Sequence, residues 1–269
     1  GFTLFLGRTD NFPNWYKRRI NRIYPTIIMW ALLSSLFFDW SWYVEELIIP
    51  PRYWFVPCIM VYYVIFYIIR TFFMNHLKWV FTIFFVVIAL SSIWLLDYTK
   101  SVMYADVSFM RVYYFLFMLL GAMTAISKRK ERTPLRAGVY TIISVGLYYV
   151  CMGSYKLDST LCRFQLISLM PLLSTIYWLF VFCDAAKVAR IFDKSWIGRP
   201  VYFISTLTLE VYMVQYALFT DRFNDIFPWN ILLTYIVIFL IAYFLKCSSN
   251  LFSLLFKEDR ITWEKVCQV

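Results

Sequence analysis

Long apolar segments run through most of this chain, separated by short stretches that carry charge, proline or asparagine. A spanning helix needs about 20 mostly apolar residues, and shorter segments can be completed by residues at the membrane interface. Inside a bilayer every backbone N–H and C=O must be satisfied internally, which favours helices. The sequence therefore predicts an all-α, polytopic helical membrane bundle. About eight spanning helices are expected, over residues 23–38, 54–70, 79–96, 110–127, 137–153, 164–183, 201–220 and 229–245.

The composition excludes an ordinary soluble protein. Hydrophobic residues make up 62% of the chain and charged residues 16%, whereas soluble domains average roughly 45–50% and about 25%. A soluble fold of this size could not bury so much apolar surface. The net charge of +10 lies in short loops between apolar segments, which is typical of membrane topology. We therefore expect the lipid bilayer as a partner and no nucleic acid.

Lysine and arginine fix the expected orientation. Numbered along the chain, one set of alternate connections holds 20 of the 26 basic residues. By the positive-inside rule this set faces the cytoplasm. Both ends of the chain then lie near the cytoplasmic side of the membrane. The 20 residues are Arg8, Lys17, Arg18, Arg19, Arg22, Arg70, Lys78, Lys128, Arg129, Lys130, Arg132, Arg136, Lys187, Arg190, Lys194, Arg199, Lys246, Lys257, Arg260 and Lys265.

The first residues resemble the end of a further helix. The segment 1–6 is apolar but far too short to span a bilayer. If it ends a span that enters the cytoplasm, one more helix before it would return the N-terminus of the parent protein to the cytoplasm. We therefore expect a single transmembrane domain over 1–269 that lacks its first helix, from a parent of about ten spans.

A basic cluster precedes the first expected span. Arg19 and Arg22 are three residues apart, so on a helix they share one face, and Lys17 and Arg18 flank them. Arginine can hold phosphate through two hydrogen bonds, so the cluster could bind a nucleotide-like polyanion. The alternative is a topology anchor that contacts anionic lipid headgroups, and the charges alone favour it.

Aromatic residues flank two of the expected spans. Trp15 and Tyr16 lie beside the basic cluster, and Tyr53 to Pro57 begins the second span. Tryptophan and tyrosine are enriched where a helix meets the membrane surface. Their position alone predicts that they belong to such an interfacial belt.

Glu210 is the candidate for chemistry within the membrane. It falls near the middle of the expected span 201–220, with Ser205, Thr208, Tyr212 and Gln215 nearby. A carboxylate at membrane depth is costly and marks a functional interior by default. The alternative is a structural hydrogen-bond network between helices, and the sequence does not separate the two.

Histidine and cysteine offer little chemistry. His76, the only histidine, is expected to be a solvated loop residue. The six cysteines form no CxxC pair and fit small buried hydrophobic residues, so we expect no metal site.

Four motifs taken in order resemble the acyltransferase-3 family of membrane O-acyltransferases. They are Gly1–Phe2, the basic segment from Lys17 to Pro25, the segment from Trp54 to Pro57, and the segment from Leu207 to Gln215. The resemblance implies about ten helices and transfer of an acyl group, often acetyl, from cytoplasmic acyl-CoA to a carbohydrate hydroxyl. The acceptor would be an envelope or exported polysaccharide or a glycolipid, and the membrane the bacterial inner membrane.

The resemblance also implies roles for particular residues. Arg19 and Arg22 match the family's Arg-x-x-Arg motif, which with Arg18 would meet the CoA phosphates. Gly1–Phe2 matches the end of a Ser-Gly-Phe motif. The family's proposed catalytic histidine lies in a helix before residue 1, which leaves Glu210 as the candidate within this chain.

One departure keeps other functions open. The family's late motif usually ends in histidine where this chain has Gln215, and glutamine cannot act as a base at neutral pH. A catalytically inactive member that scaffolds a synthesis complex is therefore one alternative. A transporter or flippase of a lipid-linked sugar is another, although such proteins more often show internal symmetry or paired broken helices.

Overall fold

A computed structural model of the protein describes residues 1–7, 10–50, 53–99, 109–127, 133–156, 161–219, 225–256 and 262–268. Throughout this part of the chain the regular structure is helical, which confirms the all-α prediction. Among the described residues, six helices are long and apolar enough to cross a membrane, as expected of a polytopic membrane protein. They are Phe12–Phe38 (α2), Phe55–Phe72 (α4), Met74–Leu95 (η2 with α5, Leu77–Leu95), Pro134–Gly153 (α7), Cys162–Asp184 (η4 with α8, Leu169–Asp184) and Trp229–Leu255 (α12).

The two remaining expected spans differ from simple long helices. Helix α6 (Met110–Ile126) is apolar but has only 17 residues. The expected span 201–220 is two helices, α10 (Ser195–Thr206) and α11 (Thr208–Leu218), bent by 68°. If the bent pair counts as one span, up to seven spans qualify by length and composition.

Two helices extend well beyond their expected bounds. Helix α2 begins at Phe12, with a proline in its first turn, so the basic cluster is helical and Pro25 lies inside the helix rather than at its start. It ends where Asp39 takes a left-handed conformation (φ 52°), which aspartate tolerates better than most residues. Helix α12 continues to Leu255, so Lys246 lies within a helix rather than in a tail.

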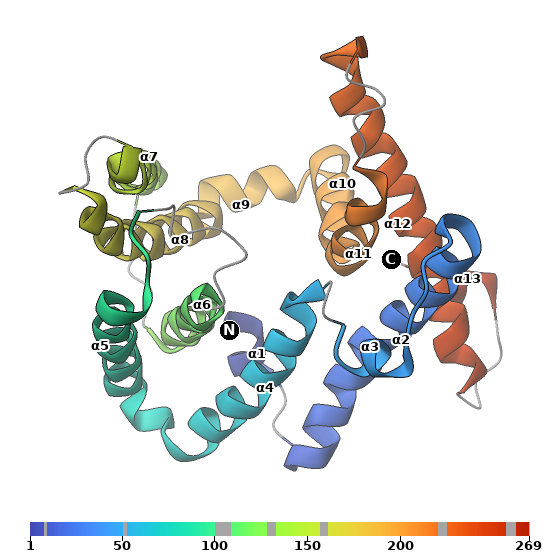
Figure 1. Ribbon diagram of the computed structural model, residues 1–269, viewed down its shortest axis with the longest axis horizontal. Helices are drawn as coiled ribbons and strands as arrows, with labels where there is room; N and C mark the ends of the chain where they lie inside the picture. The colour runs from blue at the N-terminus through green and yellow to red at the C-terminus, as the bar shows by residue number, and fades with distance from the viewer. Residues whose placement is uncertain are drawn as a thin grey trace. The chain divides into compact units, whose positions relative to one another are not determined.

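The described chain divides into two compact units. Unit 1 comprises Gly1–Thr9 and Tyr62–Lys194, and unit 2 comprises Asp10–Val61 and Ser195–Val269. One of the three boundaries, between Val61 and Tyr62, falls within α4, and the helices of each unit can be followed by their labels in Figure 1. Unit 1 also holds α1 (Phe2–Leu6), η3 (Ser154–Lys156) and α9 (Ala186–Phe192). Unit 2 also holds α3 (Val44–Ile48) and α13 (Trp263–Val266).

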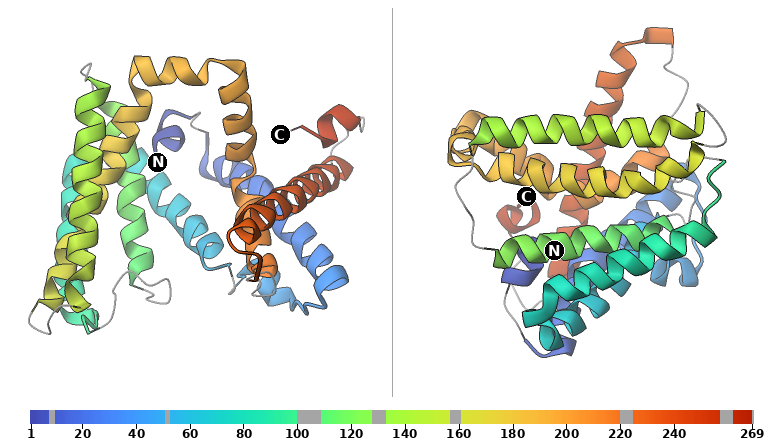
Figure 2. Two further views of the ribbon diagram at one scale, coloured as in Figure 1. Left: turned by 90° about the horizontal axis from the view of Figure 1, so that it is seen from above. Right: turned by 90° about the vertical axis from the view of Figure 1, so that its left-hand side faces the viewer.

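Unit 1 is built by close packing of apolar helices. Helices α7 and α8 lie side by side along their length (Figure 2), where the Ser144 and Ser174 hydroxyls are 2.8 Å apart. Helices α5, α6 and α8 share an apolar core of Ile88, Met110, Tyr113, Leu116, Leu169 and Leu173.

The short helix α1 is held against α6 by two glycines. A Cβ on Gly1 would come within 1.9 Å of the Met118 carbonyl oxygen, and one on Gly121 within 2.9 Å of the Phe2 nitrogen. Arg70 donates to the carbonyls of Leu4 (2.9 Å) and Gly7 (2.6 Å) at the end of α1. The glycine of the first motif is therefore required for close helix packing.

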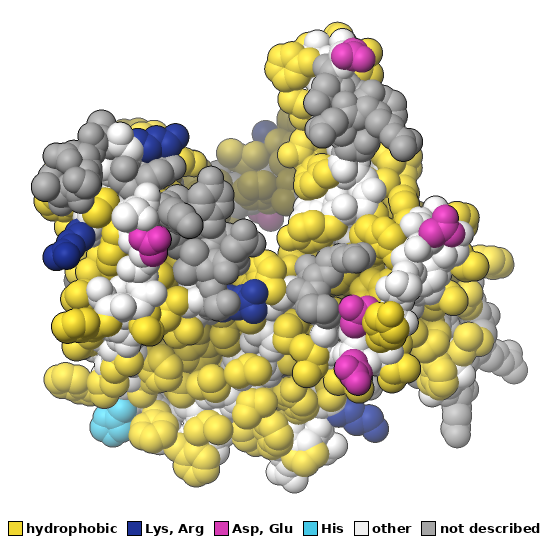
Figure 3. Space-filling model, in the orientation of Figure 1, with side chains coloured by type: hydrophobic (Ala, Val, Ile, Leu, Met, Phe, Trp, Pro, Cys, Tyr) yellow, Lys and Arg dark blue, Asp and Glu magenta, His cyan; other side chains and the backbone are white. Residues whose placement is uncertain are grey.

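Large apolar side chains remain exposed on many helices of both units. Trp94 (86% exposed), Leu135 (78%) and Ile142 (73%) are examples from unit 1. Hydrophobic side chains dominate the face shown in Figure 3. In water such a surface would cause association, whereas lipid can cover it.

Candidate functional site

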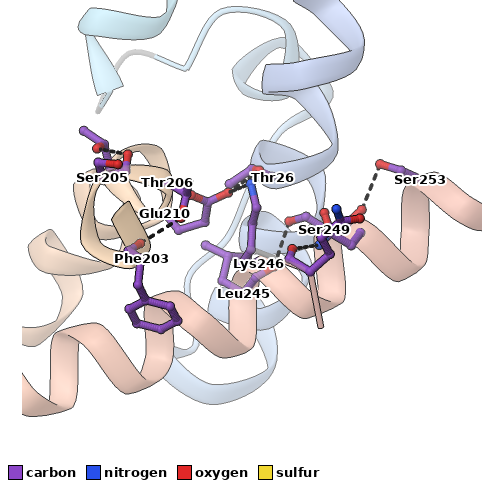
Figure 4. A network of polar contacts seen from close by, with 12 residues as sticks. Thr26, Phe203, Ser205, Thr206, Glu210, Leu245, Lys246, Ser249 and Ser253 are labelled. Carbon is purple, nitrogen blue, oxygen red and sulfur yellow. Dashed lines mark hydrogen bonds and ion pairs between the residues drawn. The ribbon is translucent and has the colours of Figure 1, made fainter. Parts of the chain in front are cut away.

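The site is centred on Glu210, which is only 1% exposed. Its Oε1 lies 3.2 Å from the Lys246 Nζ of α12 and accepts a hydrogen bond from the Thr26 hydroxyl of α2 at 3.3 Å. Figure 4 shows these side chains meeting from α2, α11 and α12. A charge buried in this way persists only when it is paired or hydrogen-bonded, and Glu210 is both.

The bend between α10 and α11 places Glu210 at the start of a helix. Hydroxyls around the bend bond to nearby carbonyls: Ser205 to Tyr202, Thr206 to Phe203, and Thr208 to Ser205. Such local bonds compete with the helix ladder and are often found where helices bend. Glu210 is consequently in the first turn of α11 rather than in the middle of a helix. The helix dipole stabilises a negative charge in that first turn.

Lys246 belongs to this candidate site, although the sequence predicts that it follows the last span. The sequence places it in a cytoplasmic tail, but it is 26% exposed on α12 and pairs with Glu210. Thr26 is a second member of the site that the sequence did not reveal. A signal existed for the lysine, because isolated opposite charges in apolar helices tend to pair with each other. No comparable signal marked the threonine.

The second carboxylate oxygen of Glu210 has a different environment. Oε2 is buried, and within the described chain it has no hydrogen-bond partner. Leaving an ionised oxygen unsatisfied is expensive, and such atoms are rare in native proteins. Oε2 is therefore suited to accept a hydrogen bond from a bound molecule.

The basic cluster lies on α2, before Thr26 in the chain. The Arg19 guanidinium lies over the Trp15 ring, 4.9 Å from its centroid, and Arg18 forms an ion pair with Asp10. Arg18 and Arg22 are exposed, and Arg19 is half-buried. Thr26 is four residues after Arg22, so the two lie on one face of α2, separated by a rise of about 6 Å.

Two of the aromatic residues, Trp15 and Tyr53, do not belong to the interfacial belt expected from the sequence. Trp15 and Tyr53 are both 0% exposed, so neither can face lipid headgroups. Trp15 supports Arg19 through the stacking contact. The Tyr53 hydroxyl accepts from the Trp30 indole at 2.6 Å and donates to the Met213 carbonyl at 3.0 Å, which ties α2 to α11.

Tyr53 and four neighbouring rings form a connected group, which we call the ring cluster. Trp42 stacks on Tyr53 with centroids 6.0 Å apart and planes 8° apart. Tyr212 and Tyr216 meet Tyr53 edge-on at 5.9 and 5.8 Å, and Phe55 meets Tyr212 at 5.7 Å. The Trp42 indole donates to the Ser34 hydroxyl at 2.8 Å, which fixes the orientation of the stack.

Other residues considered in the sequence take no part in this site. His76 is exposed in η2 (Met74–His76), as expected. The described residues hold no cluster of three or more potential metal ligands. Several basic loop residues used for the topology prediction lie outside the described residues, among them Arg8, Lys128, Arg129, Lys130, Arg132, Lys257 and Arg260.

Comparison with known proteins identifies a family for this chain. A family model described as an acyltransferase domain, Acyl_transf_3, matches residues 1–247. That range includes every residue of the site around Glu210 and of the ring cluster. None of the curated proteins compared with the chain matches it, and none of the solved structures does.

Proposed function

Because the chain belongs to the acyltransferase-3 family of membrane acyltransferases, we propose that it moves an acyl group from cytoplasmic acyl-CoA to a carbohydrate hydroxyl. Acetyl is the acyl group we expect, and the acceptor is a polysaccharide or glycolipid of the bacterial envelope. The observation that carries the proposal is the arrangement on α2. The exposed Arg22 is followed, one turn later, by Thr26, which bonds to a buried carboxylate.

In this proposal the arginines bind the donor. CoA carries a pyrophosphate and a further phosphate, and arginine is well suited to grip such groups with paired hydrogen bonds. Arg18, Arg19 and Arg22 supply the guanidinium groups. Because Arg19 rests on the Trp15 ring, it gives up less side-chain freedom on binding.

The reaction is a direct transfer of the acyl group from sulfur to oxygen. The acceptor hydroxyl oxygen attacks the thioester carbonyl carbon, the C–O bond forms, and the C–S bond breaks to release CoA as a thiol. The hydroxyl proton must go to a base, and the family resemblance implies a histidine that precedes Gly1 in the full protein. Glu210 is the candidate within this chain for orienting a substrate through Oε2.

The donor assignment is tested with membranes that contain the full-length protein. Transfer of radiolabel from acetyl-CoA to envelope glycan is measured for Arg19→Ala and Arg22→Ala. Loss of a charge-assisted hydrogen bond should raise the KM for acetyl-CoA about tenfold or more in each variant. Arg19→Lys keeps the charge but not the paired geometry, so we expect an intermediate KM.

A matched control separates CoA binding from lipid anchoring. Arg136 is an exposed arginine on α7 that is expected on the same side of the membrane. Arg136→Ala should leave the KM unchanged. Unchanged transfer in the Arg19 and Arg22 variants, or labelling of both residues from the outer face, would refute the donor assignment. A transporter would move sugar without releasing CoA thiol, which a thiol assay detects directly.

A further inference from the structure

We propose that the ring cluster is the acceptor subsite, where a pyranose ring packs against aromatic faces while one of its hydroxyls reaches Glu210 Oε2. This inference rests on the proposed function and assigns the substrate that Glu210 orients. It concerns unit 2 alone, since α2, α11 and the ring cluster all belong to that unit.

The order of groups along α2 supports the assignment. Arg19 and Arg22 come first, Thr26 then bonds to Glu210, and Trp30 and Ser34 then hold Tyr53 and Trp42. From Arg22 to Ser34 the helix rises about 18 Å. The cationic groups and the ring cluster therefore lie on opposite sides of Glu210 along this helix. This order fits a donor bound at the arginines and an acceptor bound at the rings, with the two substrates meeting at Glu210.

Helix α11 repeats the same order. Glu210 bonds to Thr26, and Met213, one turn later, accepts the hydrogen bond from Tyr53. Tyr216 follows after another turn and contacts Tyr53. The axial rise from Glu210 to Tyr216 is about 9 Å, which is within the span of a disaccharide.

The rings are fixed before any ligand binds. Tyr53 is held by two hydrogen bonds, and Trp42 by its bond to Ser34 and by its stack on Tyr53. Side chains that are already fixed lose little conformational entropy on binding. The free energy gained from contact with them is therefore not offset by the cost of ordering them. Aromatic side chains that are held rigidly in this way are suited to the recognition of a ligand.

Exposure distinguishes the ring cluster from both a closed core and an interfacial belt. Tyr53 is fully buried, whereas Tyr216 is 44% and Phe55 37% exposed, so the group has a closed base and an open rim. Aromatic faces carry partial negative charge. The C–H groups on one face of a pyranose carry partial positive charge and are apolar, so they complement these rings.

The hydrogen-bonding groups favour a sugar over a lipid chain. Glu210 Oε2 is a buried acceptor that requires a donor. A sugar presents apolar C–H faces and hydroxyl donors together, whereas an acyl chain has no donor. The acceptor hydroxyl that is held at Oε2 is then also the one that attacks the thioester.

Saturation-transfer NMR tests the subsite, because it detects sugar protons that lie against protein rings. The full-length protein in lipid nanodiscs is mixed in turn with D-glucose, D-galactose, N-acetyl-D-glucosamine and L-rhamnose, with glycerol as a polyol without a ring. We expect saturation of the ring C–H protons of at least one sugar and none of glycerol. Absence of saturation for all four sugars would overturn the proposal.

Variants locate the signal. Trp42→Ala should reduce the saturation at least about threefold, as expected for the loss of one aromatic contact, and Trp42→Phe should restore most of it. Phe37→Ala, which removes a ring that is 72% exposed near the end of α2, should have no effect. An equal loss in the Phe37 and Trp42 variants would assign the signal to the general aromatic surface and refute the subsite.

Two further measurements complete the test. If Trp42→Ala fails to fold, Tyr216→Leu removes an exposed ring of the cluster and should give the same loss. Binding of acetyl-CoA is measured separately on the same nanodiscs. Sugar saturation without acetyl-CoA binding would remove the proposed donor but keep this subsite, whereas the reverse would remove the subsite and keep the donor.

Discussion

The two units of this protein differ in the kinds of side chain that they bury. In unit 1 the buried side chains described by the structure are apolar or uncharged, and helices approach closely through glycine and serine. Unit 2 instead buries a charged carboxylate and a chain of hydrogen-bonded aromatic groups. A buried charge within apolar helices is costly, so Glu210 makes unit 2 the candidate location of the functional site.

The largest effect is expected at the ion pair in unit 2. Lys246→Ala would leave Glu210 buried without its cation and should lower the free energy of unfolding by about 3 kcal/mol. Thermal unfolding of the purified protein in detergent, followed by tryptophan fluorescence, measures this. The exposed Lys78→Ala of unit 1 should change stability by less than about 0.5 kcal/mol.

A double variant sharpens that result. Glu210→Gln with Lys246→Gln removes both charges, so most of the lost stability should return while acyl transfer does not. Full stability of the single Lys246→Ala variant would mean that the ion pair does not hold α12 to α11.

The next effect is expected in the aromatic part of unit 2. Tyr53→Phe keeps the ring but leaves the buried Trp30 N–H and the Met213 carbonyl without their shared partner. We expect a loss of about 2 kcal/mol, measured in the same unfolding assay. Tyr43→Phe is the control, since Tyr43 is 71% exposed; equal losses in both variants would contradict the assigned role of the Tyr53 hydroxyl.

A smaller effect on stability is expected where the backbones of α1 and α6 are in contact in unit 1. Gly121→Ala must displace α1, because the new Cβ would lie 2.9 Å from the Phe2 nitrogen. The expected cost is about 1 kcal/mol. A Cβ on Gly146 of α7 would meet nothing within 4 Å, so Gly146→Ala should be neutral or stabilise through helix propensity. The prediction fails if the two variants shift the unfolding temperature in the same direction.

The smallest effect is expected at the contact between α7 and α8. Ser144→Ala removes a hydroxyl bond to Ser174, and such bonds between membrane helices average about 0.6 kcal/mol. Thr141→Val deletes only a bond to the carbonyl of Ala137 in the same helix. A loss in the Thr141 variant as large as in the Ser144 variant would show that the interhelical bond adds nothing specific.

Most of the fold was predictable because apolar length determines spanning helices. The boundaries were less predictable, and the reasons are local. Lys246 ends an apolar run and so resembles the end of a helix, yet α12 continues beyond it to Leu255 and the lysine pairs with Glu210. The bend after Thr206 involves no glycine or proline at the break; the cluster of Ser205, Thr206 and Thr208 was the available sign.

The candidate site was predictable only in part. Glu210 and the arginines could be identified because charge near apolar segments is conspicuous. Their relation to one another could not, since it depends on which helix faces meet in three dimensions. The sequence predicts Tyr53 and Trp15 at the membrane surface, but both are buried in the structure. The position of a residue along the chain cannot show that its ring points inward.

The bend between α10 and α11 also constrains how the protein is made. The two halves have 12 and 11 residues, and neither alone is long enough to cross a bilayer. The second half also brings Glu210 into the apolar phase before α12 has been synthesised. We therefore expect stable insertion of this segment to require the helix that carries Lys246. A ribosome stalled before residue 229 should leave the α10–α11 pair poorly integrated into the membrane.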